Sequence, residues 1–143
     1  MVDGYQTLLH KWFDQVWNMK NAGAIREMLD EDSVHYGLSG PGAGAVRGFE
    51  EFEKFHREFI TAFPDLHVEV EDVISEGDKL AGRYTVTGRQ DGQLQGAPET
   101  KKKVLFNGFG MCTTKDGKFV EVWNSVDFPK MAYDLDPNTP DVE

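Results

Sequence analysis

The chain has 143 residues, of which 39% are hydrophobic, and a formal net charge of −10 at pH 7. This length suits one domain that buries its own core, and the acidic balance argues against nucleic acid or an anionic membrane surface as a partner. A single cysteine rules out an intramolecular disulfide, and neither a long apolar run nor a signal-peptide pattern is present, so we expect a cytoplasmic protein.

Three helices are predicted in the N-terminal part of the chain. Apolar residues recur at helical spacing across residues 5–17, and a short helix is expected at residues 24–29. A third helix over residues 49–63 carries phenylalanines on one stripe and ends before Pro64. Core packing explains such a stripe, and the wall of a wide apolar pocket is the alternative.

A brief strand at residues 33–36, which carries His35, and a glycine-rich loop at residues 38–48 separate the second helix from the third. The loop resembles a phosphate-binding loop only superficially. It lacks the Lys-Ser/Thr pair at its end and a βαβ context, so nucleotide binding is not predicted.

The rest of the chain is predicted to form β-strands. Residues 66–76 and 79–90 are joined by a Gly-Asp turn, and the alternation of the first strand slips near Asp72, which indicates a β-bulge. Helices followed by an antiparallel four-stranded meander make an α+β fold, with the helices packed on one face of a curved sheet.

The last two strands, at residues 101–114 and 118–128, are joined by an Asp-Gly turn. Gly108 and Gly110 fall on the same face of the first of them. Glycine inside a strand is typical of a bend or of a close approach by a ligand.

The final strand has an unusual pattern of side chains. One face is expected to hold Val120, Val122, Asn124 and Val126. The opposite face is expected to hold Phe119, Glu121, Trp123, Ser125 and Asp127. An asparagine among valines suggests that the first face borders a pocket.

Several short motifs in a fixed order carry a resemblance to a known family. They read WFDQVWN, VHYG, VRGFEEF, AFPDLHVEVEDVISEGDK, RYTVTG, GAPET and VEVWNSVD. Their order and spacing resemble the SnoaL-like polyketide cyclase family, within the cone-shaped nuclear-transport-factor-two-like superfamily. The resemblance implies a cone-shaped α+β barrel, in which three helices close a strongly curved sheet around an apolar pocket. It also implies homodimers or tetramers formed through the outer face of the sheet, and we expect Phe119 and Trp123 to lie there. Residues 1–135 are taken as the single domain and residues 136–143 as a flexible tail.

The resemblance also implies a chemistry. Family members close an aromatic polyketide ring by an intramolecular aldol condensation without metal or cofactor, and an aspartate in the cavity acts as acid and base. The aligned position in this chain, directly after Trp123, is Asn124, whose amide can hydrogen-bond a carbonyl but cannot accept the proton. The histidine that some cyclases carry is matched by Gly110. No metal site is expected, because the four histidines show no i, i+4 pair.

Two residues remain as candidate catalytic groups. His35 is the best proton carrier left, although a histidine satisfied at a strand end is an equal alternative. Asp127 is the nearest carboxylate to Asn124, but odd spacing puts it on the opposite face unless the strand bulges. The residues expected to bind a ligand are Trp17, Phe52, Phe55, Phe59, Gly110, Val122 and Asn124.

Three functions follow from these residues. The first is a cofactor-free lyase or isomerase that acts on a small apolar carbonyl compound, with His35 or Asp127 moving the proton. The second is a hydrolase-like or hydroxylase-like member of the superfamily, for which an Asp-Arg-Asp cluster is not found. The third is a non-catalytic protein that binds a small molecule, which the replacement of the family aspartate by Asn124 favours.

Overall fold

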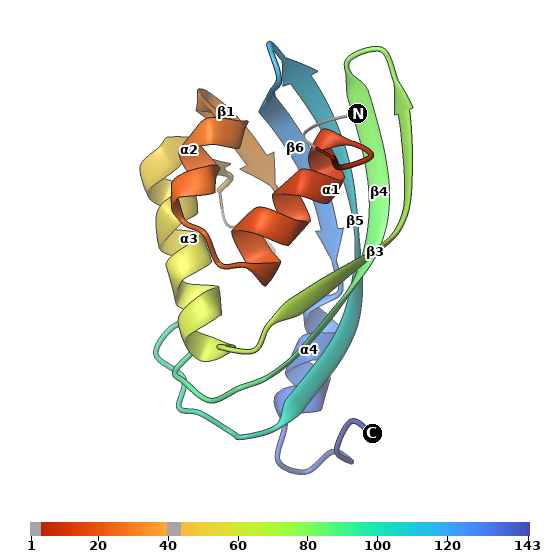
Figure 1. The fold of residues 1–143 in the computed structure, drawn as a ribbon. Helices are drawn as coiled ribbons and strands as arrows, with labels where there is room; N and C mark the ends of the chain where they lie inside the picture. Colours follow the sequence, from red (N-terminus) through yellow and green to blue (C-terminus); the bar gives the residue numbers. More distant parts are fainter. Residues whose placement is uncertain (1–3, 40–43) are drawn as a thin grey trace.

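One sheet carries the fold, and most helices cover one of its faces. The computed structural model describes residues 4–39 and 44–143. Within these ranges six strands are ordered β2-β1-β6-β5-β4-β3, and α1, α2 and α3 lie on the concave side of the bent sheet (Figure 1). In chain order, the elements are α1 (Leu8–Trp12), η1 (Phe13–Asn18), α2 (Gly23–Met28), β1 (Leu29–Tyr36), β2 (Val46–Arg47), α3 (Gly48–Ala62), β3 (His67–Glu76), β4 (Lys79–Arg89), β5 (Lys103–Lys115), β6 (Lys118–Val126) and α4 (Phe128–Leu135). The predicted α+β class with helices on a curved sheet is confirmed.

The sheet is larger than the predicted meander. Strands β3 to β6 pair antiparallel in chain order, as expected. β1 adds to β6 in parallel, with His35 opposite Val122, and β2 pairs with β1. The strand at residues 33–36 was predicted, but its place in the sheet was not, because a parallel pair needs a long crossover and leaves no local turn signal in the sequence. The short strand β2 was not predicted.

Turns and bulges follow the local sequence closely. The pairing of β3 with β4 shifts register between Val70 and Asp72, which confirms the predicted bulge. Asp116 and Gly117, between β5 and β6, both have positive φ, as a tight hairpin turn of the primed type requires. Both predicted hairpins are therefore present.

The first predicted helix is divided. After the five residues of α1, the chain continues as the π-helix η1. The Nε2 atom of His56, on α3, lies 2.7 Å from the carbonyl oxygen of Val16 and donates to it. A π-turn is often associated with a functional site, and this one carries Trp17.

The strand β6 contains a bulge that the sequence analysis missed. Its register against β5 runs from Thr113 opposite Glu121 to Thr114 opposite Phe119, so Val120 is the extra residue. The bulge turns Phe119 inward, where it is 2% exposed. The expectation that Phe119 lies on the outer face was therefore wrong.

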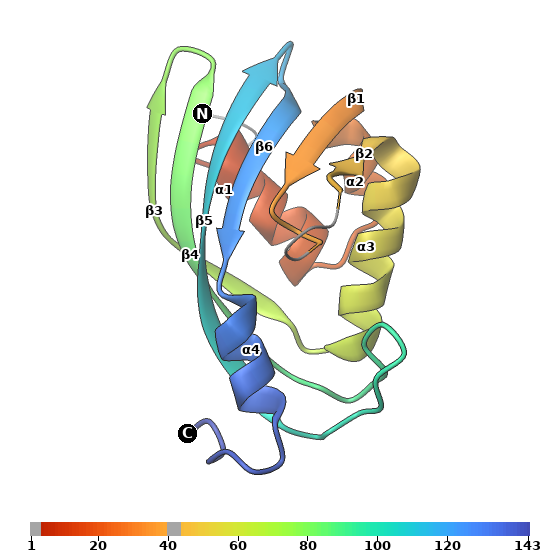
Figure 2. The ribbon, with the colours of Figure 1, turned by 180° about the vertical axis from the view of Figure 1, so that it is seen from behind.

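The last strand also ends earlier than predicted, because a fourth helix follows it. The side chain of Asp127 accepts a hydrogen bond of 3.0 Å from the backbone N–H of Lys130 and so caps α4. Asp134 accepts from the backbone N–H of Leu105 at 2.9 Å, and thus α4 continues along β5 where β6 has ended (Figure 2). Pro129 lies in the first turn of this helix, where proline is well tolerated.

Residues 40–43 of the glycine-rich loop lie outside the described residues. Within the segment taken as a tail, the carbonyl oxygen of Thr139 accepts a hydrogen bond of 2.9 Å from the ammonium of Lys102. No helix in the described part of the chain is long and apolar enough to cross a membrane.

Candidate functional site

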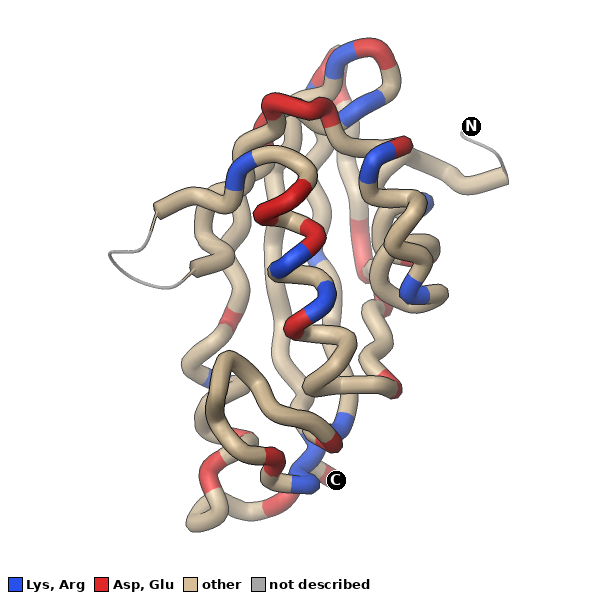
Figure 3. Tube along the Cα trace, turned by 90° about the vertical axis from the view of Figure 1, so that its left-hand side faces the viewer, with Lys and Arg blue, Asp and Glu red and all other residues tan. Residues whose placement is uncertain are grey.

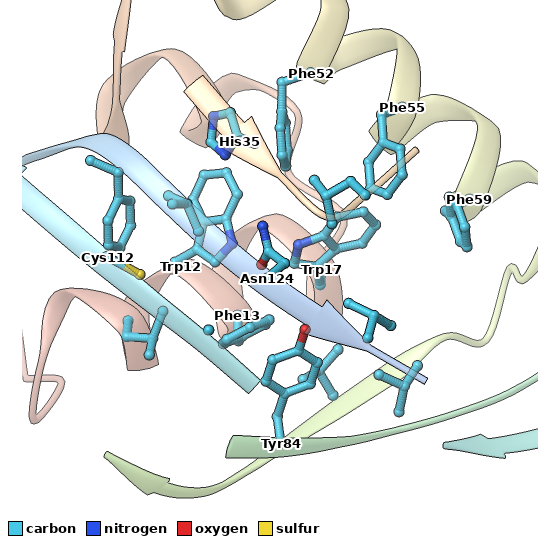
Figure 4. Close-up of a pocket in the computed structure, with 18 of the residues that line it drawn as sticks. Trp12, Phe13, Trp17, His35, Phe52, Phe55, Phe59, Tyr84, Cys112 and Asn124 are labelled. Carbon is cyan, nitrogen blue, oxygen red and sulfur yellow. The ribbon is translucent and has the colours of Figure 1, made fainter. Parts of the chain in front are cut away.

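The helices and the sheet enclose a cavity of about 100 Å³. All residues that we expected to bind a ligand lie on its wall, namely Trp17, Phe52, Phe55, Phe59, Gly110, Val122 and Asn124. His35 lies there too (Figure 4). Whether these residues bind a ligand stays a prediction.

The helical side of the wall is an aromatic cluster. Phe52 lies at the centre, with ring centroids 5.1 Å from Trp12, 6.3 Å from Trp17 and 5.9 Å from Phe55. Phe55 in turn lies 4.8 Å from Phe59, one turn further along α3. The stripe of phenylalanines thus serves as core and as cavity wall at once, so the two interpretations of the sequence both hold.

On the sheet side, two glycines have different roles. A Cβ atom on Gly108 would lie 2.4 Å from the ring of Tyr84, its partner across β4 and β5, so glycine is needed there to make room for that ring. A Cβ atom on Gly110 would meet no atom closer than the Oδ1 of Asn124, at 3.6 Å. Gly110 therefore leaves open space on the cavity wall.

Tyr84 is a site residue that the sequence analysis missed. Its side chain is buried, and burial raises the pKa of its hydroxyl. Figure 4 shows that hydroxyl directed into the cavity. The available signal was the pairing of a tyrosine in one strand with a glycine in the next, but it could be recognised only once the strand register was known.

His35 projects from β1 and is 1% exposed. Its Nε2 atom lies 3.1 Å from the Oγ of Ser33, and its ring packs on Phe52 at 4.7 Å. Burial lowers the pKa of His35 to about 4, so the imidazole is neutral at pH 7. Its Nδ1 atom has no hydrogen-bond partner among the described residues. A neutral imidazole with a free nitrogen can accept or donate one hydrogen bond.

Asn124 is held in place from the neighbouring parallel strand. Its Nδ2 donates a hydrogen bond of 2.9 Å to the carbonyl oxygen of Tyr36. This geometry depends on the pairing of β1 with β6, which places Tyr36 opposite Trp123. An amide or a protonated acid can donate this bond, whereas an ionised carboxylate cannot.

Asp127 does not belong to the cavity. Its residue is exposed, and its carboxylate caps α4. The candidate catalytic role for Asp127 is corrected accordingly, because the strand ends before it and does not bulge to turn it inward. No Asp or Glu is found among the described residues that line the cavity.

Cys112 lies on the cavity wall, but it is buried, and burial raises the pKa of its thiol to about 12. Such a thiol is a poor nucleophile at neutral pH. In the described residues, no group of three or more His, Cys, Asp or Glu side chains could hold a metal ion.

The outer face of the sheet exposes large apolar side chains. Trp123 is 53% exposed and stacks on Tyr36 with ring centroids 4.0 Å apart. Three further exposed residues, Ile74, Phe109 and Met111, join Trp123 around one shallow hollow.

Comparison with known proteins places this geometry in context. Residues 7–135 match the model of the SnoaL-like polyketide cyclase family. A solved SnoaL-like protein from Jannaschia sp. CCS1 is 26% identical, with a TM-score of 0.80 over 93% of this chain and 91% of that one. AclR from Streptomyces galilaeus is 27% identical, with a TM-score of 0.77 over 93% of this chain and 82% of its own.

A third structure, IdmH from Streptomyces antibioticus, is 24% identical, with a TM-score of 0.76 over 90% of this chain and 95% of that one, and it supports the fold alone. A comparison with curated proteins gave no match. The family model covers nearly the whole chain, from the first helix to the end of α4. The chain therefore belongs to the SnoaL-like polyketide cyclase family.

Proposed function

We propose that this protein binds a small apolar carbonyl compound inside the cone. The observation that carries the proposal is the cavity wall, which has no Asp, Glu, Lys or Arg among its described residues. Charged residues occur instead along α3 (Figure 3), where Glu50, Lys54 and Arg57 are exposed. Such a wall disfavours a charged ligand, because an ion that enters the cavity loses its hydration and finds no oppositely charged side chain to compensate for the loss.

The volume limits the size of the ligand. A cavity of about 100 Å³ corresponds to the volume of roughly three water molecules, at about 30 Å³ each. One ring is therefore the largest ligand that this volume suggests, and a fused system of several rings requires side chains to move. The family assignment supports a carbonyl group in the ligand, because polyketides are built from keto units.

Binding of acetophenone, a one-ring ketone, tests the proposal by calorimetry. Replacing Gly110 by Leu should abolish this binding while leaving the fold intact, because the new Cβ has room and the rest of the side chain enters the cavity. Asn107→Leu is the matched control, since it adds the same side chain to an exposed position of the same strand. Equal binding by the wild type and Gly110→Leu would show that the ligand does not occupy this cavity.

A catalytic role is the second candidate, and the Nδ1 atom of His35, which has no hydrogen-bond partner among the described residues, favours it. A neutral imidazole beside a bound ketone can take a proton from the carbon next to the carbonyl, as a cofactor-free lyase or isomerase requires. The test is exchange of the methyl protons of acetophenone in D2O. Exchange faster than in buffer, and lost in His35→Gln, supports catalysis. Exchange at the buffer rate leaves binding alone as the function.

A further inference from the structure

We propose that Tyr84, Trp12 and Trp17 form a cluster of hydrogen-bond donors that recognises one uncharged oxygen acceptor. The ligand class is therefore a neutral one-ring ketone or a similar carbonyl compound, in preference to a hydrocarbon or a carboxylate. This inference rests on the proposed binding function and names the groups that would hold the carbonyl oxygen.

The indole nitrogens of Trp12 and Trp17 supply the first observation. The two side chains are only 7% and 9% exposed. Neither indole N–H has an acceptor among the described residues. Yet no fully buried side-chain nitrogen or oxygen in the described residues lacks a partner. Both N–H groups therefore have some accessible surface, and Figure 4 shows both nitrogens directed towards the middle of the cavity, near Asn124.

The third tryptophan shows that an indole in this protein otherwise finds an acceptor. Trp123, on the outer face, donates from Nε1 to the carboxylate of Glu121 at 3.0 Å. The unpaired state of the cavity indoles is thus a property of their position. An indole N–H can only donate, so what it lacks is an acceptor.

Tyr84 adds a donor from the opposite wall. Its side chain is 7% exposed, and its hydroxyl has no hydrogen-bond partner among the described residues. By the same reasoning this hydroxyl is open to the cavity. It points from β4 towards the side of the cavity on which the two indoles lie (Figure 4).

The donors are held rigidly. The indoles pack edge-on against Phe52, with centroid distances of 5.1 and 6.3 Å, and the ring of Tyr84 packs on Phe13 at 4.6 Å and over Gly108. Because the donors are already ordered before the ligand binds, binding costs less conformational entropy, and the affinity is higher.

The balance of donors and acceptors determines the ligand class. Two indoles can only donate, Tyr84 and His35 can do either, and the Oδ1 of Asn124 can only accept, so the side-chain donors outnumber this acceptor and the wall matches a ligand that accepts. A bound hydrocarbon would displace water from the N–H groups and offer them no hydrogen-bond acceptor. A carboxylate could accept, but the described wall offers no cation, and the chain carries a net charge of −10.

Three probes of similar size separate these classes: acetophenone, ethylbenzene and benzoate. For the wild type we expect acetophenone to bind about tenfold more tightly than ethylbenzene, and benzoate to bind more weakly than both. Tyr84→Phe should weaken acetophenone binding by about three- to tenfold and leave ethylbenzene unchanged. The control is Tyr133→Phe, which removes a hydroxyl from an exposed tyrosine on α4 and should change neither.

Nuclear magnetic resonance of the wild type provides an independent measurement that does not depend on any variant folding. The chain has three indole N–H signals. Acetophenone should shift those of Trp12 and Trp17 downfield more than ethylbenzene does, while Trp123 stays unchanged as an internal control.

The possible outcomes distinguish a failure of this inference from a failure of the proposed binding function. Equal affinities for acetophenone and ethylbenzene, or equal losses of both in Tyr84→Phe, would overturn oxygen recognition and leave apolar binding in place. Failure of both neutral probes to bind would overturn the proposed function and this inference with it. Tight binding of benzoate alone would overturn the assignment to an uncharged ligand.

Discussion

Replacing Asn124 by Asp should make the stability of the protein depend strongly on pH. The amide of Asn124 donates to the carbonyl oxygen of Tyr36 at 2.9 Å. A protonated aspartic acid can donate the same bond, but an ionised one places a negative oxygen against a carbonyl oxygen beside the apolar wall. The pKa of the new carboxyl should therefore rise above its usual value of about 3.9.

The size and sign of the effect follow from this geometry. Losing the donated bond and leaving a charge in a poorly solvated place costs about 3 kcal/mol, which corresponds to a pKa raised by about two units. A carboxyl whose pKa is raised on folding destabilises the protein as pH rises. The variant should thus match the wild type near pH 4, lose stability up to about pH 6, and stay about 3 kcal/mol less stable above that.

Urea unfolding of the variant and the wild type at a series of pH values measures this difference. Asn21→Asp is the control, because Asn21 is exposed and accepts a hydrogen bond from the backbone N–H of Gly23, which a carboxylate can also do. Its difference from the wild type should be small and almost independent of pH. A flat pH profile for Asn124→Asp, equal to that of the control, would refute the placement of Asn124 between Tyr36 and the cavity.

Three further predictions concern other parts of the molecule. Because burial lowers the pKa of His35 to about 4, the wild type should lose up to about 3 kcal/mol of stability as pH falls from 6.5 to 4; urea unfolding should show less of this loss in His35→Gln. His56→Phe leaves the carbonyl of Val16 without its donor, so it should lower the free energy of unfolding by about 1–3 kcal/mol, whereas an unchanged midpoint in urea would mean that this bond contributes nothing. We also propose that the outer sheet face joins two copies of the chain, since Trp123 and its apolar neighbours are exposed there; sedimentation should show a dimer or larger species for the wild type and monomer for Trp123→Glu, and a monomeric wild type would contradict the proposal.

Local features of the fold could be predicted from the sequence, and long-range pairings could not. The turn at Asp116 and Gly117 and the bulge before Asp72 depend on neighbouring residues, so their signals are in the chain itself. The bulge at Val120 has no such signal, because only the partner strand β5 shows that one residue of β6 is left over. This single residue explains why Phe119 was placed on the wrong face.

The site residues also fall into two groups, those that local sequence patterns could place and those whose position depends on distant parts of the chain. Helical periodicity was enough to place Phe52, Phe55 and Phe59 on one wall, and alternation was enough for Val122 and Asn124. Tyr84 was missed because its place in the cavity depends on Gly108 in the next strand. Asp127 was expected to lie on the last strand. The strand instead ends at Val126, and the side chain of Asp127 caps the helix α4 that follows.

The parallel pairing of β1 with β6 has a consequence for the order of folding. The hairpins of β3 to β6 join neighbouring segments, whereas the bond from Asn124 to Tyr36 spans 88 residues. Contacts between such distant segments must overcome a larger loop-closure entropy and tend to form late. We therefore expect the hairpins to assemble first and the cavity to appear only when the N-terminal segment docks on β6. A cavity ligand should then slow unfolding while leaving the refolding rate nearly unchanged.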